Sequence, residues 1–139
     1  MAIRQLSIFI QNSRGQMADA VRTIADANIN IKAMSVADSR DFGILRLIVS
    51  DNARAVSLLS ENTLVKLTEV VAVRMEDIEG SLYKILKVLA KAEIDVEYSY
   101  SFTASKNPSP YAVFRVDDIA KAEEVLTANG FTLLSESDL

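Results

Sequence analysis

The sequence predicts an α+β protein made of two copies of one β-α-β-β-α-β unit, at residues 1–69 and 70–139. Three observations lead to this fold class. Small and apolar residues recur at a long, nearly constant offset. Segments with strand and helix periodicity follow each other in the same order in both halves. Turn-forming residues separate them at equivalent places. A unit of this size buries little surface alone, so we expect the copies to share an interface.

The repeat is clearest around the first glycine of each half. Residues 12–17 (NSRGQM) match residues 77–82 (DIEGSL) at an offset of 65. Further along, Asp51 matches Asp118 at an offset of 67, so the second copy has a two-residue insertion in its hairpin. Self-similarity over such a period indicates a duplicated structural unit.

Each copy opens with a strand and an amphipathic helix. Residues 5–10 alternate between polar and apolar, as a half-buried strand does, and residues 71–75 are their counterpart. The next segment carries a single apolar stripe at helical spacing. Asn28 is expected to end the first helix in the left-handed conformation. The stripe consists, in the two copies, of Met17, Ala20, Val21, Ile24 and Ala25, and of Leu82, Ile85, Leu86, Leu89 and Ala90.

A hairpin, a second helix and a last strand complete each copy. Asp51 and Asp118 are well placed to cap the second helices. This element order predicts two ferredoxin-like units, each an antiparallel sheet with both helices on one face. The expected hairpin strands are 29–36 with 43–49, and 94–102 with 111–116; their turns are 38–41 and 105–110, and the last strands lie near 64–70 and 131–134.

Composition excludes several classes of function. The chain has no Cys and no His, which removes thiolate chemistry, disulfides, the commonest general base and the commonest transition-metal ligand. The net charge is −4, and Lys and Arg are scattered, which argues against a nucleic-acid partner. No apolar run approaches the roughly 20 residues that span a bilayer. We therefore expect a cytoplasmic protein with no metal, no cofactor and no membrane contact.

The turn before the first helix of each copy is the candidate ligand site. Asn12 and Asp77 each precede a glycine, Gly15 or Gly80, by three residues. Glycine allows a positive φ and a close approach of ligand to backbone. The free N–H groups of a helix start can hold a carboxylate, while Asn12 or Asp77 can accept from an ammonium group. This pattern suits a free amino acid, although the same residues form ordinary turns and caps.

The element order and the N/D-x-x-G turn, followed by Met17 or Leu82, resemble the ACT domain, here as a tandem, free-standing pair covering nearly the whole chain. The resemblance implies a non-catalytic regulatory module that binds a small metabolite, an amino acid above all, at these turns and at the interface between units. It also implies a homodimer and a regulated metabolic enzyme as partner. The ligand-binding residues that it implies are Asn12, Gly15, Gln16 and Met17, and Asp77, Gly80, Ser81 and Leu82, with a further group on the second strands, Met34, Ser35, Ser99 and Ser101.

Two departures from the family pattern stand out. Many members have Pro before the turn glycine, where this chain has Arg14 and Glu79, and Asn12 is neutral where an acid is common. The two units are therefore expected to differ in ligand or in affinity.

Other interpretations stay open. Ser13 and Gln16 fit a plain capping box, and the repeat alone would suit a dimerisation module without ligand. A small hydrolase or isomerase would use Tyr and paired carboxylates, although acidic side chains are most often solvated and strand tyrosines half-buried. The carboxylates in question are Glu76, Asp77, Glu79, Asp95 and Glu97, and the tyrosines are Tyr83, Tyr98, Tyr100 and Tyr111.

Overall fold

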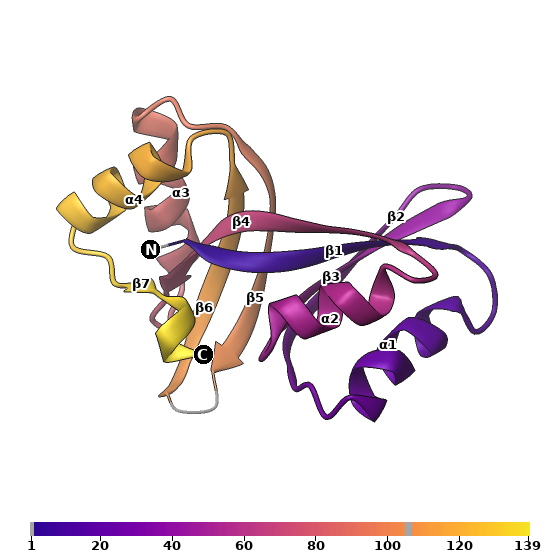
Figure 1. Cartoon of the computed structure of the whole chain (residues 1–139). Coiled ribbons are helices and arrows are strands. Elements are labelled where there is room, and N and C mark those ends of the chain that lie inside the picture. Colours follow the sequence, from indigo (N-terminus) through magenta and orange to yellow (C-terminus); the bar gives the residue numbers. More distant parts are fainter. Residues whose placement is uncertain (1, 105–106) are drawn as a thin grey trace. The chain divides into compact units, whose positions relative to one another are not determined.

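The computed structural model describes residues 2–104 and 107–139 and separates into two compact units (Figure 1). The N-terminal unit is Arg4–Thr68. The C-terminal unit is Glu69–Leu139 together with the preceding Ala2 and Ile3. Because the division falls inside a continuous strand, β4 (Leu64–Arg74), the domain limits at 69 and 70 stay a prediction.

The N-terminal unit has an antiparallel sheet with β3 between β1 and β2. Both helices pack on the sheet face that carries Leu6 and Ile8 of β1. Its elements are β1 (Ile3–Gln11), α1 (Gln16–Asp26), β2 (Ile31–Asp38), β3 (Phe42–Val49), α2 (Asn52–Leu59) and the first part of β4. Its buried core consists of Leu6, Ile8, Ile10, Ala20, Ile24, Ala27, Ile29, Leu45, Leu47, Val49, Ala55 and Leu59.

The C-terminal unit repeats this arrangement with the strand order β7-β4-β6-β5, all antiparallel. Figure 1 shows α3 and α4 on the same side of its sheet. The alternate strand residues Val71 and Val73 face these helices, which confirms the predicted one-sided ferredoxin-like fold. Its elements are the rest of β4, α3 (Ser81–Lys91), β5 (Val96–Ala104), β6 (Asn107–Val116), α4 (Ile119–Ala128), β7 (Leu133–Leu134) and the 3₁₀ turn η1 (Glu136–Asp138). Its buried core consists of Val71, Val73, Ile85, Leu89, Ile94, Ala112, Phe114, Val116, Ala122 and Leu126.

Several helices begin or end at capping residues that the sequence predicts. The Asp51 carboxylate accepts from the Arg54 amide at 3.1 Å, and the Asp118 carboxylate accepts from the Lys121 amide at 3.0 Å, which confirms both predicted caps. Asn28 has the predicted positive φ, 57°, after α1. The equivalent residue after α3 is Glu93, also at 57°. A glutamate adopts this conformation less readily than asparagine, so Glu93 was not predicted to be the left-handed residue that follows α3.

The predicted helical stripes are right at their centres and wrong at their ends. Ala20 and Ile24 are buried as predicted, whereas Met17 is 42% exposed. Ala25 is also exposed, because the residue after Ile24 is turned about 100° around the helix axis. The second copy behaves in the same way, with Leu82, which is 45% exposed, and Ala90 outside the core.

The predicted half-burial of β1 is also wrong in part. Gln5 and Ser7, the polar residues of the alternation, are buried. Gln5 Nε2 donates to Ser7 Oγ at 3.1 Å, and Ser7 Oγ lies 3.4 Å from Thr68 Oγ1. Polar side chains can be buried when they satisfy one another in this way.

The turn predicted at 105–110 is wrong from Asn107 onward, where the chain forms a strand. Ser105 and Lys106 lie outside the described residues, and β6 already begins at Asn107. The strand extends through Pro110 because a proline carbonyl can still accept, here from the Met75 amide at 2.8 Å.

Candidate ligand-binding site

The two glycine turns open their helices in the same way. Gly15 has φ 86° and Gly80 has φ 83°, and neither α1 nor α3 has a side-chain cap on its N-terminus. The capping-box interpretation is therefore wrong for α1, where the contact between Ser13 and Gln16 is a backbone hydrogen bond of 3.3 Å. By contrast, α2 and α4 are both capped by aspartate. Because α1 and α3 lack such a cap, N–H groups in their first turns can bind water or a ligand.

Asn12 connects its turn to the β2–β3 hairpin. Its Nδ2 donates to the Ser39 carbonyl at 2.7 Å and to the Phe42 carbonyl at 3.1 Å. Its Oδ1 would lie 2.9 Å from a Cβ added to Gly43, so the side chain fills the space above that glycine. The amide nitrogen is thus used within the unit, and a contact between Asn12 and a ligand stays a prediction.

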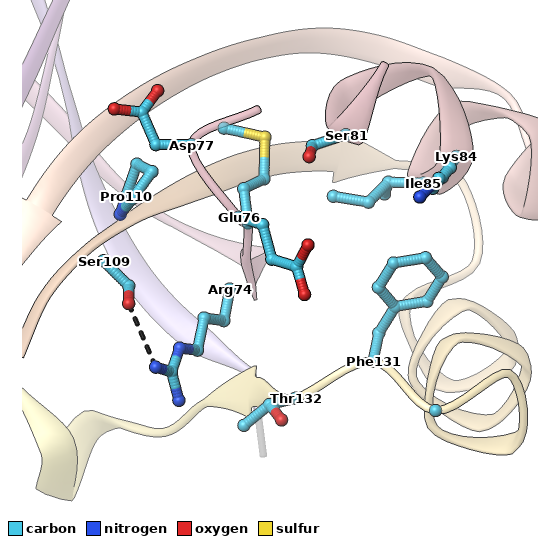
Figure 2. Close-up of a pocket in the computed structure, with 12 residues that line it drawn as sticks. Arg74, Glu76, Asp77, Ser81, Lys84, Ile85, Ser109, Pro110, Phe131 and Thr132 are labelled. Atoms are coloured by element: carbon cyan, nitrogen blue, oxygen red, sulfur yellow. Dashed lines mark hydrogen bonds between the residues drawn. The ribbon is translucent and has the colours of Figure 1, made fainter. Parts of the chain in front are cut away.

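The C-terminal unit contains a cleft of about 690 Å³, which we call the β4–α3 cleft (Figure 2). It lies where the end of β4 and the following turn meet the start of α3, the first part of β6 and the segment before β7. This volume is typical of small-molecule sites. Its lining residues are Arg74, Met75, Glu76, Asp77, Ser81, Lys84, Ile85, Ser109, Pro110, Gly130, Phe131 and Thr132.

Charged groups from three successive parts of the chain line this cleft. Arg74 ends β4, and its Nη2 donates to Ser109 Oγ at 3.0 Å. Figure 2 shows the Glu76 carboxylate pointing toward the middle of the cleft, between Arg74 and Phe131. Lys84 projects from α3. The Asp77 carboxylate lies beyond Pro110 in the same view, on the rim.

An apolar wall faces these charges. Ile85 is fully packed into the core, with 1% of its surface exposed, while Met75 and Phe131 pack partly against the same core. Figure 2 shows the Phe131 ring turned toward Ile85 and the Glu76 carboxylate. The cleft can thus hold an aliphatic stem on one side and polar groups on the other.

The structure brings together only some of the residues implied by the ACT resemblance. Asp77 and Ser81 both line the β4–α3 cleft, whereas Gly80 and Leu82 sit beside it on the turn and on the outer side of α3. The candidates Ser99 and Ser101 lie on β5, opposite Phe114 and Ala112, and do not line the cleft. In the N-terminal unit, Gly15 ends the equivalent turn, Gln16 and Met17 begin α1, and Met34 and Ser35 lie on β2.

Three charged cleft residues were not among the predicted ligand-binding residues: Arg74, Glu76 and Lys84. Arg74 and Lys84 belong to no predicted motif, and Glu76 was interpreted as a solvated acidic side chain. A signal was present in the repeat, because these are positions at which the two copies differ in charge. At the offset of 65, their equivalents are Phe9, Gln11 and Asp19.

The carboxylates that the enzyme interpretation requires do not form a single cluster, and one of them is already paired. Glu97 pairs with Arg115 at 3.3 Å on neighbouring strands. The Tyr111 ring is buried and stacks on Phe102 at 5.5 Å between centroids. Within the described ranges, no cluster of acidic side chains has a geometry that could hold a metal ion. None of the described helices combines the length and apolarity needed to cross a bilayer.

A family model described as an ACT domain pair matches residues 1–139. The chain belongs to this family. The resemblance found in the sequence is therefore confirmed, and this ACT domain pair accounts for the duplicated unit. ACT domain pairs are regulatory modules.

Solved structures agree with this assignment. Protein BT0572 from Bacteroides thetaiotaomicron is 38% identical, with a TM-score of 0.91 covering 99% of this chain and 95% of that one. The regulatory subunit of aspartate kinase from Thermus thermophilus is 14% identical, with a TM-score of 0.66 over 91% of this chain and 89% of that one. Its counterpart from Thermus flavus is 15% identical, with a TM-score of 0.63 over 90% and 88%. At such identities, these two subunits show the shared fold alone. A search of the curated proteins finds no match.

Proposed function

We propose that this ACT domain pair is a non-catalytic regulatory module whose C-terminal unit binds a free amino acid in the β4–α3 cleft. The observation that carries the proposal is the set of opposite charges around one small cleft. Glu76 supplies an acceptor for an ammonium group, and Arg74 and Lys84 supply donors for a carboxylate. The apolar wall provides a surface for the ligand's carbon chain.

Regulation then follows from differential binding. A ligand that contacts β4, α3 and the segment before β7 at once favours the arrangement in which these three are packed together. A metabolic enzyme bound to the module would sense this shift as a change in its own equilibrium. We still predict that an interface between units contributes to ligand binding. The cytoplasmic location also stays a prediction.

The test is thermal unfolding of the purified chain against the common amino acids, each at millimolar concentration. A ligand at about a hundred times its dissociation constant stabilises the folded state by roughly 2.7 kcal/mol. We expect a rise in Tm with one chemical group of amino acids, and its loss in Glu76→Gln. The matched control is Gln11→Glu at the equivalent N-terminal position, which should leave the rise unchanged.

If no amino acid raises Tm, the proposal is wrong, and the pair is better described as an interaction module without a ligand. That alternative has one observation in its favour, because several large apolar side chains are exposed: Met17, Met34, Val36, Phe42, Leu64, Leu67, Ile78, Leu82 and Tyr83.

We also propose a homodimer formed through the free edge of β2. In the described part of the chain, β2 pairs with β3 alone and exposes Met34 (54%) and Val36 (48%) beside that edge. An open edge with apolar side chains favours pairing with another strand. Light scattering should give twice the chain mass for the wild type and the single mass for Val36→Lys. Ser101→Lys, at the equivalent place on β5, is the control and should remain dimeric.

A further inference from the structure

The β4–α3 cleft is lined by two cations and two carboxylates, and one of the carboxylates is turned away from its middle (Figure 2). Arg74 and Lys84 are cations that line it, and Glu76 is the carboxylate that Figure 2 shows pointing inward, while Asp77 stands on the rim. Among the described residues, neither Glu76 nor Lys84 forms an ion pair, so both are available to a ligand.

The Arg74 guanidinium is held in position by a neutral side chain, that of Ser109. Its Nη2 donates to Ser109 Oγ, and a guanidinium has five N–H donors, so the other donors remain for a ligand. The Arg74 backbone amide donates to the Thr132 carbonyl at 2.9 Å, which fixes the root of the side chain against the segment before β7. A planar donor group fixed at both ends suits a carboxylate, which it can bind in a bidentate manner.

The charge count selects among amino acids. A neutral amino acid has one ammonium and one carboxylate, so it would leave one of the two cations without a partner. A basic amino acid would place a second cation against them. An acidic amino acid has two carboxylates and one ammonium, which match Arg74, Lys84 and Glu76 group for group. Charge-assisted pairs are stronger than neutral hydrogen bonds, so this matching favours the acidic ligand.

The N-terminal unit shows that these charges are not required by the fold. The same backbone there carries Phe9 in place of Arg74, Gln11 in place of Glu76 and Asp19 in place of Lys84. Phe9 lies under the Lys66 ammonium at 5.9 Å, an apolar and aromatic use of that position. The repeat therefore keeps its shape without the three charges, and their presence in one copy calls for another explanation.

We infer that the ligand of the β4–α3 cleft is an acidic amino acid, of the aspartate or glutamate type, with its two carboxylates on Arg74 and Lys84 and its ammonium on Glu76. The inference rests on the proposed function and specifies its ligand class.

The experiment is titration calorimetry of the full chain, with L-aspartate and L-glutamate compared with L-asparagine and L-glutamine. The amides keep the shape and the ammonium but lose one negative charge. Loss of one charge-assisted pair weakens binding by about tenfold or more, so we expect the better acidic ligand to bind at least that much more tightly than its amide. Lys84→Gln should weaken the acidic ligand and reduce this ratio, whereas Asp19→Asn in the N-terminal unit should change neither.

Three other results would each contradict a different part of the proposal. Binding of the amides as tightly as the acids would refute the acidic ligand and leave amino-acid binding intact. Binding of succinate or glutarate as tightly as the amino acids would refute the role of Glu76 and the ammonium. If no amino acid binds at all, the proposed function fails, and this inference fails with it. Circular dichroism of each variant confirms that a lost signal reflects the cleft and not unfolding.

Discussion

Gly43 lies in the middle of a close contact between β3 and the first glycine turn. A Cβ at this position would be 2.9 Å from Asn12 Oδ1, 3.6 Å from Ile10 Cγ1 and 3.8 Å from the Ala37 carbonyl. Asn12 cannot move away easily, because its Nδ2 is bonded to two carbonyls of the hairpin. The glycine is thus required by space and not by backbone conformation.

We expect Gly43→Ala to lower the free energy of unfolding by about 1–3 kcal/mol, as overpacking of a buried position does. The cost should fall in an Asn12→Ala background, where the obstructing oxygen is gone. Urea unfolding of the two single variants and the double variant measures the coupling. Equal costs of Gly43→Ala in both backgrounds would show that Asn12 is not the obstacle.

The turn glycines are required for the opposite reason. A Cβ added at Gly15 or Gly80 would meet nothing within 4 Å, but both residues have positive φ. Gly80→Ala should therefore cost roughly 1–2 kcal/mol through the left-handed conformation alone. Gly80→Asn should cost less, because asparagine tolerates this conformation. Thermal unfolding that ranks alanine as no worse than asparagine would contradict this account.

Two kinds of helix start occur in this chain, one capped by aspartate and one that follows a glycine. We expect substitutions at these two kinds of helix start to change stability by different amounts. Asp118 accepts from an amide in the first turn of α4, whereas Ser81 opens α3 without capping it. Asp118→Ala should cost about 1 kcal/mol of stability. Ser81→Ala, its control, should change stability by less than about 0.5 kcal/mol. Similar losses in both variants, measured by urea unfolding, would remove the distinction between the two kinds of helix start.

The order of elements could be predicted from the sequence because periodicity and turn residues are local signals. The caps at Asp51 and Asp118 and the left-handed Asn28 were found for the same reason. Burial of Gln5 was not predicted, because it depends on hydrogen bonds with other side chains. The start of β6 at Asn107 was missed because the prolines resemble those of a turn, although the Pro110 carbonyl still accepts a hydrogen bond.

The candidate site was predicted only in part. Asp77 and Ser81 were found because they belong to a short motif. Arg74 and Lys84 come from the end of a strand and the inside of a helix, and only the folded backbone brings them to the same cleft. The role of Asn12 depends on a hairpin about 30 residues away in sequence, so its type alone could not reveal it.

At the scale of the whole molecule, each unit has a hydrophobic core of its own. The β4–α3 cleft lies entirely within the C-terminal unit. Saturation with L-aspartate or L-glutamate should therefore slow hydrogen exchange of amides near the cleft, such as those of Arg74 and Met75, which donate to the carbonyls of Thr132 and Pro110. Core amides of the N-terminal unit are the internal control and should change little. Equal protection in both units would show that they open together.

Because the chain is a repeat, residues of its C-terminal copy can be transferred to the equivalent positions of its N-terminal copy. Because Gly15 and Gly80 hold nearly the same φ, a side chain moved by 65 positions arrives on a similar backbone. Grafting Phe9→Arg, Gln11→Glu and Asp19→Lys together would transplant the three charges into the N-terminal copy. A successful graft would raise the number of ligands bound per chain from one to two, with no change of fold.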